Sequence, residues 1–242
     1  IFFQFFKHLF SFVIIIALTR LLSPSEFGIL AMCSAFIAIP QLIGSFALDS
    51  AIIQEKNINS TDLSSIFWLL EIVGISFFII FYFLSNYIAL FYSEPQVESI
   101  IKFLSIIFLI QPLYVVQRAL LIKGLDFKSI GKIENITIVS AGIIAIIMAR
   151  YNFGIWALVS QIILISIFSC ILYWMQCDWR PKILFNYYSL KKYSNFSLNL
   201  LGTSILNYLT RFLDKIIIGR NFDSLSLGYY NRGSNLIFRV DT

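Results

Sequence analysis

Seven runs of mostly apolar residues, each long enough to cross a lipid bilayer, constrain the fold of this chain more than any other feature. They cover about residues 1–22, 29–53, 64–92, 99–121, 133–149, 154–175 and 195–219, and an eighth begins near residue 226. A helix needs about 20 apolar residues to span the hydrocarbon core of a membrane. Backbone groups in lipid must be satisfied internally, which favours helices. The runs therefore predict an all-α integral membrane protein, a polytopic helical bundle.

The composition supports the membrane assignment. Hydrophobic residues make up 59% of the chain, charged residues only 13%, and the mean hydropathy is +0.84. A soluble domain averages about 45–50% apolar and about 25% charged residues. The net charge of +5 is typical of basic cytoplasmic loops rather than of a nucleic-acid partner. We therefore expect the lipid bilayer as a partner and no nucleic acid.

The cysteine and histidine residues give little support for a metal site or a nucleophilic catalytic site. The three cysteines, Cys33, Cys170 and Cys177, have neither zinc-site nor redox-motif spacing, and His8 is the only histidine. We therefore expect no metal cofactor and no catalytic residue.

Two prolines, Pro40 and Pro112, lie inside predicted helices. Proline within a helix removes a backbone hydrogen bond and kinks the axis, so we expect a kink at each position.

The basic residues predict the orientation of the bundle. If the first helix starts in the cytoplasm, the cytoplasmic connections hold nine Lys and Arg residues and the opposite connections hold four. Cytoplasmic loops of membrane proteins carry this excess. The connections near residues 23, 94, 152 and 222 are then on the outer side. We therefore expect a membrane protein with several passes in this orientation.

The chain aligns weakly with itself at an offset of 200 residues. The offset matches Arg20 with Arg220 and Gly28 with Gly228, so that in both copies an Arg ends one helix and a Gly opens the next. Parallel six-helix repeats are a known plan of transporters. We therefore expect a six-helix lobe over 1–176, a cytoplasmic interfacial connection over 177–194, and the first two helices of a second lobe over 195–242. The apolar start at Ile1 and the stop at Thr242 predict a fragment of a longer protein.

Polar residues at helical spacing predict the functional site. Ionisable groups within a span are costly and usually face a cavity or a partner. Cations at such depth suit an anionic head group such as a pyrophosphate, because Arg binds phosphate in a bidentate way. The residues expected to bind substrate are Lys7, Arg211, Lys215, Arg232, Asn235 and Arg239. Asp214 and Asp49 are candidates for proton or sodium coupling.

Structural interpretations of the same charges stay open. The charges could pair with one another and only orient the helices, with Asp214 as the partner of Arg211 three residues earlier. For Asp49 the two interpretations have equal weight. Glu71 lies near the start of the third run, where an interfacial charge is at least as good an explanation as a functional one.

Several sequence blocks resemble those of Wzx-type polysaccharide flippases, in the colanic-acid-exporter-like branch of the multidrug/oligosaccharidyl-lipid/polysaccharide exporter superfamily. The resemblance covers essentially the whole chain. Its main blocks are Arg20-Leu-Leu-Ser-Pro-Ser-Glu-Phe-Gly-Ile-Leu-Ala-Met32, Gly154-Ile-Trp-Ala-Leu-Val159, Trp179-Arg-Pro181, Leu213-Asp-Lys-Ile-Ile-Ile-Gly-Arg220 and Leu227-Gly-Tyr-Tyr230.

The resemblance implies a multi-pass transporter of the bacterial inner membrane rather than an enzyme. It implies two lobes of six helices, alternating access, and an undecaprenyl-pyrophosphate-linked oligosaccharide as the substrate, for O-antigen, capsule or exopolysaccharide synthesis. Polysaccharide polymerase machinery is a further expected partner. The alternatives are a membrane enzyme of the same pathway, such as a polymerase, a multidrug exporter of the same superfamily, and a purely structural scaffold. A polymerase would be expected to show a large outer loop with catalytic acids, and a cavity rich in Arg disfavours cationic drugs.

Overall fold

The computed structural model describes residues 2–44, 52–55, 58–184, 208, 210 and 212–237. Nearly all of these residues are helical, and no strand occurs among them. The main helices are α1 (Phe2–Leu21), α2 (Pro24–Gly44), α4 (Ser60–Tyr92), α5 (Gln96–Leu104), α6 (Ile107–Ile110), α7 (Pro112–Lys123), α8 (Phe127–Arg150), α9 (Trp156–Gln176) and α11 (Ser224–Ile237). Residues 212–221 form a further helical segment before α11.

Four of the described helices, α1, α4, α8 and α9, are long and apolar enough to cross a membrane. The helices α5, α6 and α7 are apolar enough to form a fifth span if they are taken together, and they bend by 47° at the break before Pro112. The kink predicted at Pro112 is therefore confirmed. Pro40 lies within α2, and the kink expected there stays a prediction. At 1.5 Å per residue, the 33 residues of α4 extend about 50 Å, more than the hydrocarbon core requires.

The sequence prediction placed the beginning of some helices too late. It began the second helix at residue 29, whereas α2 begins at Pro24, directly after Ser23. The reason is the capping chemistry at this turn. The Ser23 backbone N–H donates to Glu26 Oε2 at 2.6 Å, and Pro24 occupies the first helical position, where no backbone donor is needed.

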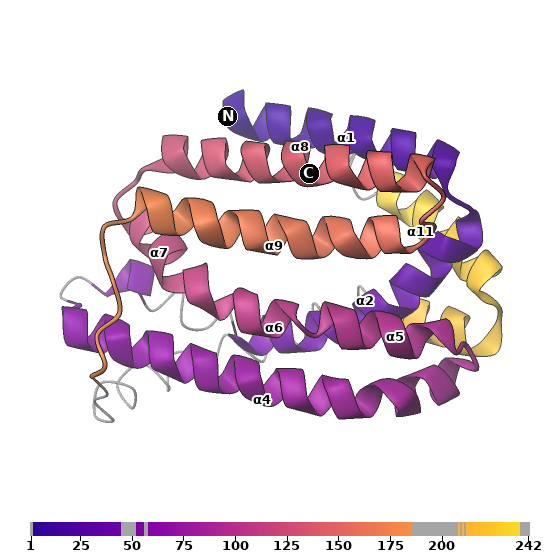
Figure 1. Cartoon of the computed structure of the whole chain (residues 1–242), viewed down its shortest axis with the longest axis horizontal. Coiled ribbons are helices and arrows are strands. Elements are labelled where there is room, and N and C mark those ends of the chain that lie inside the picture. Colours follow the sequence, from indigo (N-terminus) through magenta and orange to yellow (C-terminus); the bar gives the residue numbers. More distant parts are fainter. Residues whose placement is uncertain are drawn as a thin grey trace.

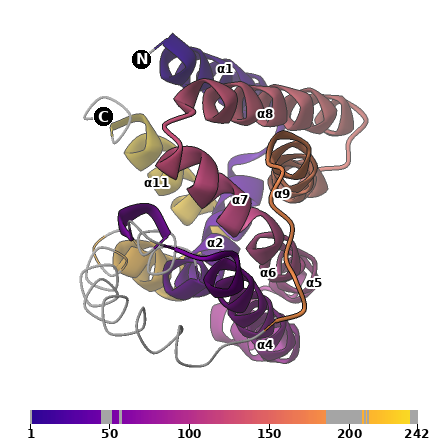
Figure 2. The ribbon, with the colours of Figure 1, turned by 90° about the vertical axis from the view of Figure 1, so that its left-hand side faces the viewer.

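The helices form one bundle with their long axes roughly aligned (Figure 1). Viewed from the end, α1 and α8 lie together on one side and α4 lies on the opposite side, with α7 and α9 between them (Figure 2). Many large apolar side chains on the outside are exposed, such as Phe83 at 72% and Leu90 at 67%. Lipid is the solvent for such a surface in a membrane protein.

The turns between α1 and α2, α4 and α5, and α8 and α9 gather at one end of the bundle, on the right in Figure 1. We call this the outer end, because the charge bias places these connections outside. An apolar cluster near it joins α2, α4, α5 and α9, and includes the fully buried Leu227 of α11. A second cluster, between α4 and α7, contains Leu70 and Val116.

Candidate functional site

A cavity of about 380 Å³, which we call the central cavity, lies between α1, α2, α9 and the C-terminal helices. Its walls are mainly apolar, with a few polar groups that converge on it. The polar lining residues are Ser11, Ser34, Gln161, Lys215 and Asn231. Binding sites for small molecules and head groups have this character, and about 300–1,000 Å³ is their usual size.

Lys215 is the one charged side chain among the described residues that line this cavity. Its ammonium nitrogen lies 5.2 Å from the centre of the Phe212 ring, and its backbone N–H donates to Asp214 Oδ1 at 2.8 Å. The Lys215 side chain is half-buried, so an anion that enters the cavity meets a positive charge that water screens only in part. Among the predicted substrate-binding residues whose side chains the structure describes, Lys215 is the one at the cavity wall.

Asp214 makes a contact between the two C-terminal helices. The Tyr230 hydroxyl of α11 donates a hydrogen bond to Asp214 Oδ2. Asp214 does not line the central cavity. Its role in ion coupling stays a prediction, and the structure adds Tyr230 as its partner.

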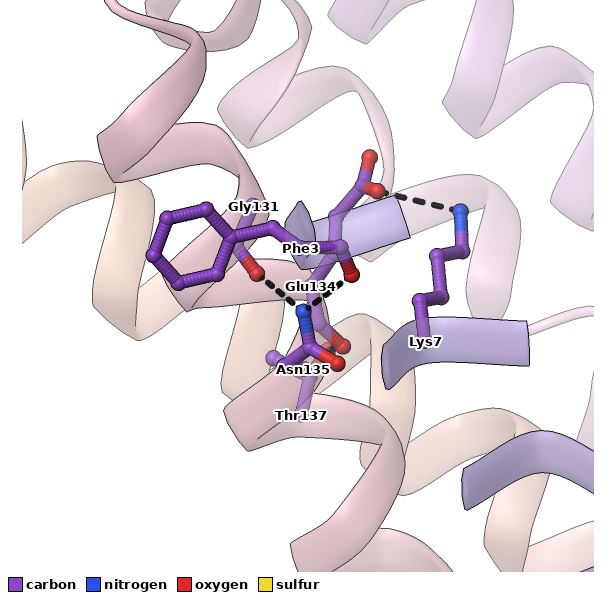
Figure 3. Close-up of polar contacts among 6 residues, drawn as sticks. All are labelled: Phe3, Lys7, Gly131, Glu134, Asn135 and Thr137. Atoms are coloured by element: carbon purple, nitrogen blue, oxygen red, sulfur yellow. Dashed lines mark hydrogen bonds and ion pairs between the residues drawn. The ribbon is translucent and has the colours of Figure 1, made fainter. Parts of the chain in front are cut away.

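Lys7 forms an ion pair with Glu134, with 3.0 Å between Nζ and Oε2 (Figure 3). The pair joins α1 to α8. One residue further on, Asn135 Nδ2 donates to the carbonyl oxygens of Phe3, at 2.9 Å, and of Gly131, at 2.7 Å. Lys7 does not line the central cavity, and its contacts are those of a helix-orienting residue. Sequence reasoning missed Glu134, although a carboxylate so near the start of an apolar run was a signal for it.

Arg232 connects α11 to the turn between α1 and α2. Its Nη2 donates to the Leu22 carbonyl oxygen at 3.0 Å, and the guanidinium carbon lies 4.6 Å from the centre of the Phe27 ring. Its Nε is buried and has no hydrogen-bond partner within the described part of the chain. The guanidinium therefore has an unused donor near the cavity wall that Phe27 helps to form.

Four predicted site residues cannot be placed. Arg211, Arg239 and Asp49 lie outside the described residues, as does the side chain of Asn235. Their predicted roles stay predictions.

Glu71 is an additional candidate for function. Its Oε1 is buried and without a hydrogen-bond partner among the described residues, and so are both polar side-chain atoms of Gln117 on the adjacent helix α7. A carboxyl group left unpaired inside a span is costly. Glu71 as a whole is half-buried, so its functional role stays a prediction beside the interfacial one.

These features define a multi-pass helical protein of the inner membrane, with a partly polar cavity between its helices. Comparison with known proteins gives the family. A model of the family described as "polysaccharide biosynthesis protein" matches residues 17–240, and the chain belongs to this family.

Three relatives show the extent of the similarity. The chain is 29% identical to the teichuronic acid biosynthesis protein TuaB of Bacillus subtilis, over 81% of the chain and 41% of the relative. It is 26% identical to the lipopolysaccharide biosynthesis protein WzxC of Escherichia coli, over 90% and 45%. It is 23% identical to the succinoglycan biosynthesis transport protein ExoT of Rhizobium meliloti, over 91% and 44%. The chain thus spans less than half the length of these relatives, and no solved structure matches it.

Proposed function

We propose that the full-length protein is a flippase, which moves an undecaprenyl-pyrophosphate-linked oligosaccharide across the inner membrane by alternating access. The family and the transport function named for one relative support this proposal. The observation that carries it is the cavity between α1, α2, α9 and the C-terminal helices, with Lys215 at its wall. The protein is then a transporter and makes or breaks no bonds in its substrate.

The cavity suits the charged part of such a substrate. A pyrophosphate is small enough for about 380 Å³, whereas an oligosaccharide of several sugars is not. Lys215 offers a point charge, and Gln161 and Asn231 offer amide groups that bind phosphate oxygens or sugar hydroxyls. The apolar walls suit the first carbons of the polyprenyl chain. The sugars then require a wider opening than this conformation has.

Energy for transport in one direction has to come from outside the substrate. We propose a proton or sodium gradient, with Asp214 as the described candidate for the coupling carboxylate and Asp49 as the second. Asp214 bridges the helical segment 212–221 and α11 through Tyr230, so a change in its charge would alter how these helices pack. Polymerase machinery that receives the translocated unit is the proposed protein partner.

A deletion of the full-length gene tests the function. We expect loss of the surface polysaccharide and accumulation of complete lipid-linked repeat units that stay accessible only from the cytoplasm. Complementation with the wild-type gene is the control. Repeat units that reach the outer face but remain unpolymerised would assign the protein to the polymerase step. Unchanged polysaccharide would contradict the proposal and favour a drug exporter.

A further inference from the structure

Helices α2 and α11 cross at two glycines that the 200-residue offset aligns. A Cβ atom added to Gly28 would lie 1.7 Å from the backbone oxygen of Ser224, and one added to Gly228 would lie 1.8 Å from the backbone oxygen of Pro24. Positions 24 and 28 correspond to 224 and 228, so the contact is reciprocal. No side chain fits at either glycine unless the helices move apart, because each built Cβ overlaps main-chain atoms.

The crossing lies between two hollow regions. On one side is the central cavity, to which Phe27 of α2 and Asn231 of α11 belong. On the other side is a pocket of about 560 Å³ at the outer end, which we call the outer pocket. Its polar lining residues include Glu26 of α2, Ser224 of α11, and Asn152 in the turn between α8 and α9. Along α2 and α11, the crossing therefore lies between residues that line the central cavity and residues that line the outer pocket.

Two arginines of the C-terminal helices contact the preceding part of the bundle at this end. Arg232 donates to the carbonyl oxygen of Leu22 at 3.0 Å, and Arg220 donates to that of Phe91 at 2.5 Å. Both guanidinium groups also lie over an aromatic ring, that of Phe27 and that of Phe91. These contacts use neutral carbonyl acceptors, so an anionic phosphate would compete well for either arginine.

We propose that the crossing of α2 and α11 at Gly28 and Gly228 is the barrier that closes the central cavity towards the outer side, and that these two helices part there to release the substrate. The proposal rests on the proposed function for its direction of transport. Close contact through small residues lets helix backbones meet without interlocking side chains. Such an interface can separate and re-form without repacking a core, which a gate requires.

Cysteine labelling tests the barrier without reference to polysaccharide export. In the full-length protein, with Cys33, Cys170 and Cys177 replaced by alanine, Ser34→Cys places a reporter thiol in the cavity. A membrane-impermeant maleimide is then added to spheroplasts. We expect slow labelling in this background and labelling roughly tenfold faster or more when Gly28→Ala or Gly228→Ala is added, because a minor open state of up to about 10% becomes dominant.

Gly233→Ala is the matched control, because it lies on the same helix as Gly228 and a Cβ added there has no atom within 4 Å. It should leave the labelling rate unchanged. The amount of each variant in the membrane is measured in parallel. Equal labelling rates for Gly28→Ala, Gly228→Ala and Gly233→Ala, at equal amounts of inserted protein, would overturn the proposal.

A second measurement holds the barrier closed instead of opening it, and so covers the case in which the alanine variants fail to insert. Ser25→Cys and Ser224→Cys both lie in the outer pocket, where a reducible bis-maleimide can link α2 to α11. Linking should stop export, and reduction should restore it. Export that continues at full rate in the linked protein contradicts the barrier. Faster labelling in the glycine variants, combined with normal polysaccharide in the gene deletion, would instead retain the barrier and reject the flippase.

Discussion

The ammonium group of Lys7 and the carboxylate of Glu134 lie 3.0 Å apart and join α1 to α8, which begins at Phe127 (Figure 3). Their side chains are 37% and 27% exposed. Such a pair is partly screened, so we expect a contribution to stability of about 1 kcal/mol. This structural role of Lys7 is an alternative to its predicted role as a substrate-binding residue.

The first prediction separates these two roles. Lys7→Glu alone should lower the unfolding temperature of the detergent-solubilised protein by about 2–4 °C, because it places two carboxylates side by side. The double variant Lys7→Glu/Glu134→Lys should restore both stability and export. A double variant that is stable but exports nothing would return Lys7 to the substrate site.

The second prediction concerns Lys215. Lys215→Gln should abolish export and leave membrane insertion intact, because it removes the one described charge at the cavity wall. Lys102→Gln is the matched control, since Lys102 pairs with Glu98 on α5 and does not line that cavity. Surface polysaccharide, measured after complementation of the deletion, gives the result. Normal export by Lys215→Gln would remove the cavity from the substrate path.

The third prediction addresses ion coupling. Asp214→Asn should make export independent of the ion gradient or abolish it, because the amide cannot change charge. Tyr230→Phe removes the hydrogen bond to Asp214 but keeps the carboxylate, and should weaken coupling less. Both are measured as export in the presence and absence of an uncoupler. An unchanged gradient dependence in Asp214→Asn would make Asp214 a structural residue.

The fourth prediction concerns pH and the start of α11. Asp223 Oδ1 accepts a hydrogen bond from the Ser226 backbone N–H at 2.8 Å, and hydrogen bonds from Ser226 lower the pKa of the Asp223 carboxyl. A lowered pKa in the folded state stabilises above the unfolded value of about 3.9, and this stabilisation is lost as the pH falls through the lowered value. Asp223→Ala should therefore destabilise the protein at pH 7 and have little effect near pH 2. Thermal unfolding in detergent at both values checks this, and equal destabilisation at both would contradict it.

The fifth prediction sets stability against function at Glu71. Glu71 is half-buried, and its Oε1 is buried without a hydrogen-bond partner among the described residues. Replacing this carboxyl by an apolar group removes the cost of burying that oxygen. Glu71→Leu should therefore raise the unfolding temperature. If Glu71 also serves transport, export should fall in the same variant. A fall in the unfolding temperature would show that Glu71 has a stabilising partner in the folded protein.

The offset of 200 residues predicted a repeat, but it did not predict where the two copies meet. Matching Gly28 with Gly228 indicated two related helices, and the caps agree, because Ser23 and Asp223 each cap the helix that follows. The offset alone gave no sign that the two glycines meet each other. That depends on how the second copy rotates against the first.

Sequence alone determined the class of fold and most of the spans. Each apolar run has to satisfy its own backbone and meet lipid, so its length and composition decide its state without reference to the other runs. Tertiary structure decided which polar groups meet. Lys7 forms an ion pair with Glu134, Arg232 donates to the carbonyl oxygen of Leu22, and Lys215 lines the cavity. These pairings join helices more than a hundred residues apart, or a helix to a space enclosed by others. They follow from packing among several helices at once, which no single segment of sequence encodes.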